Sequence, residues 1–167
     1  PLLLVGDGPE RSRLEALAGP TVTLLGRQSG QQVEQLMARC RAFVYAGLED
    51  FGIAPVEAMA SGAPVIGLGR GGLLDTVRCA SAGLQEPTGV LFPDQSVGSI
   101  VQAVEWFEQG RIWRSLDAEA IRVWAERFRP EAFSARFESA LRTAWHAHQC
   151  GCDVAASDPA EMPALRL

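Results

Sequence analysis

Residues 49–66 read EDFGIAPVEAMASGAPVI, and this stretch decides the fold class. It follows an apolar run at residues 42–46 that predicts a buried strand. Two acids then form a loop before a helix that we expect to begin near Pro55, and a second apolar run follows at residues 64–67. Strand, loop, helix and strand in this order predict a βαβ unit. Its loop would lie at the carboxyl end of a parallel sheet, where open α/β sheets bind ligands.

The same alternation of strands and helices runs along most of the chain. We expect further strands at residues 2–5, 21–25 and 88–93, and helices at residues 9–18, 29–40, 73–80, 96–109, 115–128 and 130–148. This alternation predicts one α/β domain over residues 1–149, with a Rossmann-like, mostly parallel sheet, helices on both faces, and additional C-terminal helices. Residues 150–167 lack periodicity and predict a disordered tail. Because Pro1 leads directly into an expected core strand, we expect the chain to be part of a longer protein.

Composition excludes several classes of protein. The 167 residues are 47% hydrophobic, which is enough for one domain with a core, and the net charge of −5 argues against a nucleic-acid partner. All 15 basic residues are arginines, which excludes a lysine Schiff base and a P-loop lysine. No apolar run approaches the ~20 residues that span a bilayer, and the chain does not begin with a signal-like leader. We therefore expect the four cysteines to be reduced thiols of a cytosolic protein.

The acidic loop and the start of the following helix form the candidate site. Gly52 lets the backbone approach a ligand closely, and the amides of residues 51–54 would point out from the helix start as an anion cradle. If the helix begins at Pro55, Glu57 lies in its first turn, where the helix dipole favours the charged carboxylate. Such a carboxylate can accept from two neighbouring hydroxyls, as a ribose diol offers, or it can serve only to stabilise the helix start.

The two ends of this stretch suggest the shape of a ligand. Glu49 and Asp50 come before the amide cradle and Glu57 comes after it, so hydroxyl groups could bind at both ends with an anion between them. A sugar joined to a nucleoside by a diphosphate has this form. Glycoside hydrolysis is less favoured, because one acid of a hydrolase must be kept protonated, whereas a first-turn carboxylate is kept charged.

Several other polar or glycine-rich segments carry weaker signals. Turns at residues 6–8 and 69–72 lie at the same expected edge of the sheet, but a lone G-x-G also occurs in turns without a ligand. Arg27 could meet a phosphate or lie at the surface, and a surface position is the reading we favour for Arg70. The histidines and cysteines of residues 146–152 match no standard zinc spacing, so we expect no metal site.

Glu49 and Glu57, with seven residues between them, resemble the Glu-x7-Glu signature of glycosyltransferase family 4. The flanking segments agree with the family in order: VGDGPE at 5–10, LLGR at 24–27, GRGGLLDTV at 69–77 and TGVLFP at 88–93. The resemblance covers about residues 2–109 and is far more specific than any single glycine motif.

The resemblance implies a GT-B architecture of two Rossmann-like domains, with this chain forming most of the C-terminal, donor-binding one. It implies transfer of a hexose, with retention, from a GDP- or UDP-linked sugar to a glycan or lipid acceptor, without a metal or other cofactor. By position, Glu49 would be the catalytic residue at the donor sugar and Glu57 would hold the ribose. The remaining donor-binding residues would be Phe51, Gly52 and Ile53 at the sugar and diphosphate, Gln28 at the base, and Arg27, Gly6 and Gly8 nearby. The EDFGI form most resembles mannosyltransferase-like members.

The chain also departs from the family pattern. Family members neutralise the diphosphate with an Arg and a Lys from the first strand-helix unit of the donor domain, and neither this unit nor the N-terminal acceptor domain is present in the 167 residues. We therefore expect the chain alone to bind nucleotide sugar weakly and not to turn over. The alternatives are a GT-B-type epimerase or phosphorylase, and a non-catalytic nucleotide-sugar-binding module. The resemblance places the whole protein in the cytoplasm, with peripheral association at the cytoplasmic face of a membrane left open.

Overall fold

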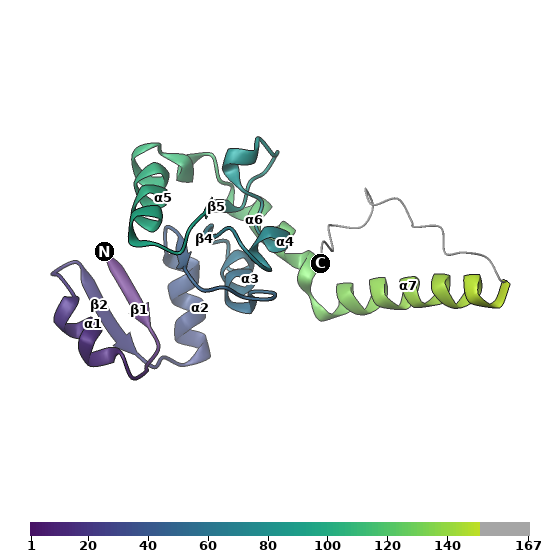
Figure 1. Ribbon diagram of the computed structural model, residues 1–167, viewed down its shortest axis with the longest axis horizontal. Coiled ribbons are helices and arrows are strands. Elements are labelled where there is room, and N and C mark those ends of the chain that lie inside the picture. The colour runs from purple at the N-terminus through teal and green to yellow at the C-terminus, as the bar shows by residue number, and fades with distance from the viewer. Residues whose placement is uncertain (151–167) are drawn as a thin grey trace.

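The computed structural model describes residues 1–150, which form an α/β fold (Figure 1). The strands are β1 Leu2–Val5, β2 Val22–Gly26, β3 Phe43–Tyr45, β4 Val65–Leu68 and β5 Gly89–Phe92. The α-helices are α1 Arg11–Leu17, α2 Gly30–Arg39, α3 Ile53–Ala60, α4 Leu73–Thr76, α5 Val97–Gln109, α6 Ala118–Ala125 and α7 Pro130–Cys150. Short 3-10 helices occur at η1 Ala80–Ala82, η2 Ile112–Arg114 and η3 Glu126–Phe128. The expected tail lies outside the described residues, except for Cys150, which ends α7.

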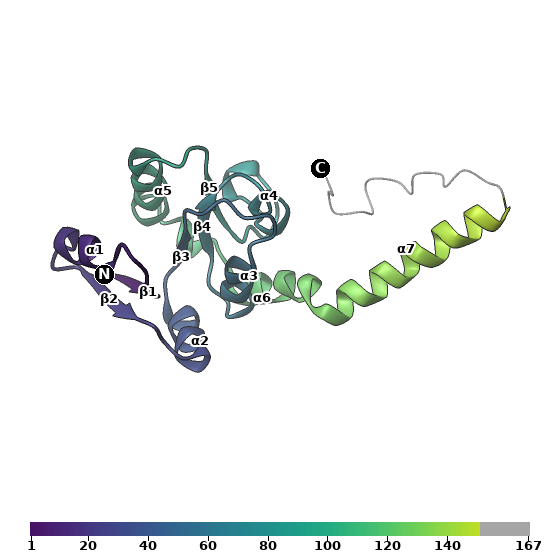
Figure 2. The same ribbon diagram turned by 60° about the horizontal axis from the view of Figure 1, so that its bottom comes forward.

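The five strands pair in parallel, as predicted, but they form two sheets and not one. β3, β4 and β5 make a three-stranded sheet in that order, and β1 and β2 make a separate pair. In both ribbon views β1 lies between β2 and the three-stranded sheet (Figures 1 and 2). The described strands therefore follow the spatial order β2, β1, β3, β4, β5, and the ladder is interrupted between β1 and β3.

The interruption explains why two expected buried strands, at residues 2–5 and 42–46, are not buried. Leu2, Leu3 and Val5 of β1 are each 44–47% exposed, and Val44 of β3 is 38% exposed. Both strands are hydrogen-bonded along one edge only, so neighbours cover them on one side. The predictions of buried strands at residues 2–5 and 42–46 are therefore wrong for the described structure. β4 shows the contrast, because it pairs on both edges and all four of its residues are buried.

Helices cover both faces of the three-stranded sheet, as the sequence predicted. Val65 points to one face, where it packs with Met59 of α3 and with Ile121 of α6. The next residue, Ile66, points to the other face and packs with Phe107 of α5. This alternation follows from the two-residue period of a strand. Each fully buried large side chain contributes about 1.5–3 kcal/mol relative to an exposed one, so these two layers hold the centre of the fold together.

Local capping explains where several helices begin. Ser29 caps α2 and forms a reciprocal capping box with Gln32. Ser96 likewise caps α5 by accepting from the amide of Ser99. α4 ends at Thr76, four residues before the expected end, and the chain there becomes extended at Val77. The expected helix at residues 115–128 is divided into α6 and η3.

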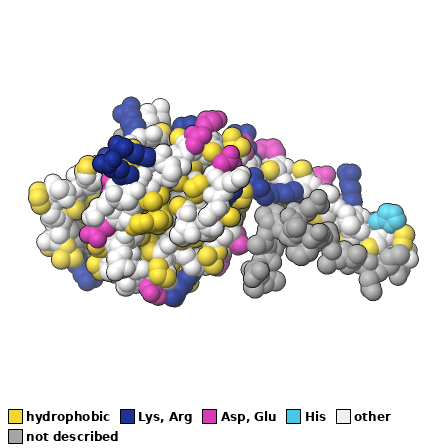
Figure 3. Space-filling model, turned by 90° about the horizontal axis from the view of Figure 1, so that it is seen from above, with side chains coloured by type: hydrophobic (Ala, Val, Ile, Leu, Met, Phe, Trp, Pro, Cys, Tyr) yellow, Lys and Arg dark blue, Asp and Glu magenta, His cyan; other side chains and the backbone are white. Residues whose placement is uncertain are grey.

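The last described helix, α7, leaves the body of the molecule as a long projection (Figure 1). Four large apolar side chains recur at every fourth position along it and are each 56–62% exposed: Phe133, Phe137, Leu141 and Trp145. By contrast, Trp124 and Phe128 of the preceding segment pack against each other at 6.1 Å. The aromatic residues around α6 therefore pack together, whereas Phe133, Phe137 and Trp145 of α7 remain more than half exposed. Figure 3 shows further apolar side chains scattered over the body.

Candidate functional site

The loop between β3 and α3 borders a hollow of about 440 Å³ at the carboxyl end of the three-stranded sheet. Its lining residues are Tyr45, Glu49, Asp50, Phe51, Gly52, Ile53 and Ala54. The structure thus brings together Glu49 and the segment 51–53, four of the residues that the sequence placed at the donor. Their individual roles stay predictions.

Gly52 determines where α3 begins. It has φ +85°, in the left-handed region that favours glycine, and its carbonyl accepts the first helical hydrogen bond, from the Val56 amide at 3.2 Å. The helix therefore begins at Ile53, two residues before the predicted start at Pro55. Pro55 fits the first turn because amides there have no intrahelical partner to lose. The amides of Ile53 and Ala54 remain as outward-pointing donors beside the hollow.

The earlier helix start corrects the position of Glu57. Glu57 is the fifth residue of α3, beyond its first turn, and it is exposed. The field of the helix dipole falls off within the first turn, so the expected stabilisation of a first-turn carboxylate does not apply. Glu57 also does not line the hollow around Glu49. Its ribose-binding role stays a prediction based on the family motif.

The glycine loop at residues 69–72 packs its backbone against the backbone of the acidic loop. The Gly72 amide donates to the Glu49 carbonyl at 2.7 Å. A Cβ added at Gly72 would lie 2.5 Å from the Asp50 carbonyl oxygen and 2.5 Å from the Phe51 Cα, and one added at Gly71 would collide with the Glu49 carbonyl. The sequence predicted only a glycine-rich turn at these residues. The structure shows that they allow two loops to pack backbone against backbone.

Phe51 connects this loop to the C-terminal part of the fold. Its ring packs edge-on against Phe128 at 5.9 Å, and Phe128 packs in the same manner against Trp124. The indole of Trp124 in turn donates to the Thr76 carbonyl at 2.7 Å. The aromatic residues around α6 therefore hold the loop against the body, although they lie more than 70 positions away in the chain.

Tyr45 is the lining residue that sequence reasoning missed. Its hydroxyl donates a short hydrogen bond to the carboxylate of Glu49. This bond, and to a lesser extent burial and the negative charge of Glu49, raises the pKa of Tyr45 to about 12. The available signal was a tyrosine at the end of a strand, four residues before an acid, and a strand-ending tyrosine usually needs no functional explanation.

The other predicted donor residues belong to the two-stranded sheet. Gly6 has φ +122° and donates to the Gly26 carbonyl at 2.9 Å, and the amide of Gly8 donates to Asp7. The Gln28 amide group donates to the Leu25 carbonyl at 2.8 Å. Arg27 is exposed. All four lie just after β1 or β2, and none of them lines the hollow around Glu49.

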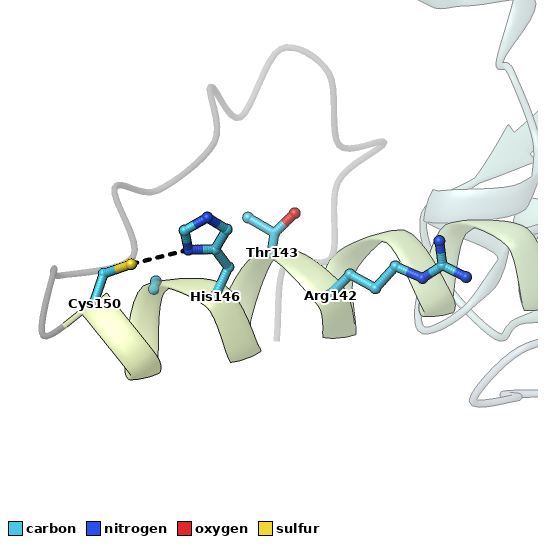
Figure 4. A pocket seen from close by; sticks show the side chains of 5 residues that line it. Arg142, Thr143, His146 and Cys150 are labelled. Atoms are coloured by element: carbon cyan, nitrogen blue, oxygen red, sulfur yellow. Dashed lines mark hydrogen bonds between the residues drawn. The ribbon is translucent and has the colours of Figure 1, made fainter.

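A second hollow lies along α7. It is lined by Arg142, Thr143, His146, Ala147 and Cys150 (Figure 4), with the Cys150 thiol 3.1 Å from the His146 Nδ1. Among residues 1–150 no group of three or more His, Cys, Asp or Glu side chains could hold a metal ion. Over the same residues, every helix is too short or too polar to cross a membrane.

Comparison with known proteins identifies the class to which this fold and site belong. Residues 1–129 match the family described as Glycosyl transferases group 1. The chain therefore belongs to this family, and its α/β fold is that of GT-B glycosyltransferase structures. The predictions of family and fold class are confirmed.

Individual relatives resemble this chain over part of their length. Over 89 residues it is 38% identical to a GDP-mannose-dependent alpha-mannosyltransferase of Mycobacterium tuberculosis, covering 53% of this chain and 23% of that protein. Over 144 residues it is 29% identical to an N-acetyl-alpha-D-glucosaminyl L-malate synthase of Bacillus anthracis, covering 83% and 36%. A solved structure of sucrose-phosphate synthase from Thermosynechococcus elongatus has a TM-score of 0.68 and 29% identity, covering 87% of this chain and 39% of that one. The chain thus spans well under half the length of these proteins.

Proposed function

We propose that this chain is the donor-binding part of a retaining glycosyltransferase that moves a hexose from a nucleotide-diphosphate sugar to a glycan or lipid acceptor. The observation that carries the proposal is the hollow in front of α3, where the Glu49 carboxylate and the free amides of Ile53 and Ala54 line one small space. A carboxylate accepts hydrogen bonds from sugar hydroxyls, and helix-start amides donate to phosphate oxygens. The hollow thus offers an acceptor for the sugar hydroxyls and donors for the diphosphate of a nucleotide sugar.

Mannose from GDP-mannose is the donor that we favour. The relative with 38% identity is a GDP-mannose-dependent alpha-mannosyltransferase. Glu49 would contact the sugar, residues 51–54 the diphosphate, and Glu57 the ribose. Gln28 and Arg27 would meet the base if the nucleotide extends toward β2. Charge neutralisation by these amides and by arginines would serve in place of a metal. The cytoplasmic location and any peripheral membrane association rest on the family resemblance and stay predictions.

The interrupted ladder indicates how the rest of the whole protein would complete this site. Amides at Leu2 and Gly6 point from β1 toward β2, and the Phe43 amide points from β3 toward β4. Because successive residues of a strand point to opposite edges, the amides of Leu3, Val5 and Val44 face the free edges. The order β2, β1, gap, β3, β4, β5 matches the doubly wound order 3-2-1-4-5-6 with its first strand left out. We include in the proposal that one parallel strand of the whole protein fills this gap.

Hydrogen exchange tests the filled gap without using a sugar. In the 167-residue chain, the amides of Leu3, Val5 and Val44 should exchange rapidly, because residues 1–150 give them no strand partner. In the full-length protein they should be protected to the level of Ile66 in the central strand β4. Equally rapid exchange in both proteins would show that no strand fills the gap.

The function is tested by sugar transfer in the full-length protein. Transfer should be lost on Glu49→Ala and on Glu57→Ala, whereas Glu34→Ala, an exposed acid on α2, serves as the matched control and should retain it. Saturation-transfer NMR with a panel that includes GDP-mannose, UDP-glucose and UDP-N-acetylglucosamine would identify the donor. Transfer that survives both site substitutions would refute the site. Donor hydrolysis or epimer formation without an acceptor would favour a GT-B-type phosphorylase or epimerase, and donor binding without any turnover would favour a non-catalytic binding module.

The isolated chain gives a further test of the incomplete site. Calorimetric titration with nucleotide sugars should give weak binding and no turnover, because the described residues leave the strand position between β1 and β3 unfilled at the edge where the diphosphate would lie. Low-micromolar binding, or steady sugar transfer by the 167 residues alone, would contradict this expectation.

A further inference from the structure

Tyr45 joins the core of the fold to the acidic loop. It is the last residue of β3, and its ring packs against the core cluster that contains Met59, Val65 and Leu73. The ring also stacks on Phe43, with centroids 6.1 Å apart and planes 16° from parallel. The core-anchored ring therefore carries its hydroxyl to the edge of the hollow, where it donates to the Glu49 carboxylate.

Gly47 provides the space for this arrangement. A Cβ added there would lie 2.9 Å from the Tyr45 hydroxyl oxygen and 3.0 Å from two carbons of its ring. The requirement is for space and not for backbone conformation, since Gly47 is not among the glycines with positive φ. Any side chain at position 47 would push the ring aside and separate its hydroxyl from Glu49.

The backbone of Glu49 is held independently of its side chain. The Gly72 amide donates to the Glu49 carbonyl at 2.7 Å, which fixes the main chain of the loop. The carboxylate lies at the end of three rotatable bonds, and the Tyr45 hydroxyl bonds to one of its oxygens. A carboxylate has about four acceptor sites, so this bond leaves the second oxygen able to accept from a ligand hydroxyl.

We propose that Tyr45 is a positioning residue of this site, whose hydroxyl holds the Glu49 carboxylate in one orientation at the hollow, in space that Gly47 leaves free. The bond between the two side chains stands by itself, and its effect on transfer rests on the function proposed above for Glu49. A carboxylate already held in one orientation loses less conformational entropy when the sugar reacts. Removing the Tyr45 hydroxyl should therefore lower mainly kcat.

A phenol titration tests the pair of side chains directly. Tyr45 is the only tyrosine in the chain, so phenolate absorbance in the near ultraviolet reports on this residue alone. With a pKa of about 12, roughly a tenth of the phenol would be ionised at pH 11, against roughly nine-tenths for an ordinary value near 10. All 15 basic residues are arginines, which keep their charge at pH 11, so the loss of positive charge that accompanies lysine titration does not occur in this chain.

The titration has a clear control and a clear refutation. Glu49→Ala should raise the ionised fraction at pH 11 several-fold, up to about ninefold, whereas Glu34→Ala should leave it unchanged. Circular dichroism at the same pH establishes that each variant is folded. A folded wild-type chain that is mostly ionised at pH 11, or a Glu49→Ala variant that titrates like wild type, would overturn the pairing.

Kinetics of the full-length transferase test the positioning role. Tyr45→Phe removes the hydroxyl and keeps the ring, so kcat should fall about tenfold while donor KM changes less than twofold. Gly47→Ala should reproduce the loss by displacing the ring. In the Glu49→Ala background, Tyr45→Phe should have no further effect on residual activity or on donor affinity, because it acts through Glu49.

The two sets of results separate the possible failures. A Tyr45→Phe variant with a lower melting temperature and unchanged kcat would show that the hydroxyl is only structural. An equal loss in the wild-type and Glu49→Ala backgrounds would show that Tyr45 does not act through Glu49. If the titration succeeds but Glu49→Ala transfers sugar normally, the side-chain pair is real and the function proposed for the site is wrong.

Discussion

Gly72→Ala is the substitution that tests the architecture of the site most directly. Gly72 has φ −61° and ψ −18°, a conformation that alanine adopts without strain, so any effect must come from contacts. The added methyl would lie 2.5 Å from the Asp50 carbonyl oxygen, 2.5 Å from the Phe51 Cα and 2.7 Å from the Asp50 carbonyl carbon. Ordinary carbon contacts are about 3.5–4.0 Å, so the two loops must separate by roughly 1 Å.

Two quantities should respond to this separation. Overpacking of this kind costs about 1–3 kcal/mol of unfolding free energy, which urea denaturation measures. A shift of about 1 Å in the Glu49 loop can cost about 100-fold in kcat/KM, because a displaced catalytic group no longer meets the substrate in a reactive geometry. The assay is sugar transfer by the full-length protein, run beside urea unfolding of the same variant.

Gly98→Ala is the matched control for this experiment. Gly98 lies near the start of α5, and a Cβ there meets nothing within 4 Å. The change should therefore stabilise the fold by about 0.5–1 kcal/mol and leave transfer unchanged. If Gly72→Ala unfolds at the wild-type urea concentration and transfers sugar at the wild-type rate, the close packing of these two loops does not position the site.

Three further outcomes follow from the packing, the capping and the titration of single residues. Phe107→Ala, at a position only 1% exposed between α5 and the sheet, should lower the unfolding free energy by about 3–5 kcal/mol in urea, and a loss below about 1 kcal/mol would contradict its place in the core. Ser29→Ala should cost about 1 kcal/mol in the same measurement because it removes the capping box of α2, while Ser115→Ala, at an exposed position outside the α-helices, should cost much less. Because the pKa of Tyr45 is raised to about 12, its contribution to the unfolding free energy is present below about pH 10 and is lost as the pH rises toward 12. Tyr45→Phe should therefore flatten this pH-dependent loss of stability in guanidinium unfolding. Identical pH dependence of the unfolding free energy in both proteins would refute it.

The elements of the fold could be predicted wherever the signal is local. The helix at residues 29–40 and the strand at residues 64–67 depend on residues a few positions apart, and the structure contains both within a residue of the expected place. The start of α3 was misplaced because Pro55 was taken as the first helical residue. The left-handed turn at Gly52 lets the helix begin earlier, and a glycine in sequence does not reveal its φ.

What could not be predicted depends on pairing between distant segments. The sequence pattern of β1 is that of a buried parallel strand, but burial also requires a neighbour on each edge, and the described residues give it one. The predicted set of site residues was incomplete for the same reason, because some of its contacts join distant segments. Glu49 and the segment 51–53 were found because they are contiguous, whereas the contacts of Gly72 with the Glu49 loop and of Phe51 with Phe128 bring together positions 23 or more residues apart.

Three glycines determine the geometry of the acidic loop, because none of them carries a side chain. Gly52 turns the chain into α3 through a positive φ, Gly47 leaves room for the Tyr45 ring, and Gly72 lets a second backbone approach Glu49 within hydrogen-bond distance. Gly52 lies at the end of the loop, Gly47 lies near its beginning, and Gly72 contacts Glu49. The loop is exposed, and exposed loops are normally variable in position. Its geometry is therefore set by close approach of backbone and ring to these glycines, and any larger residue at one of the three positions should alter the hollow even when the two glutamates are intact.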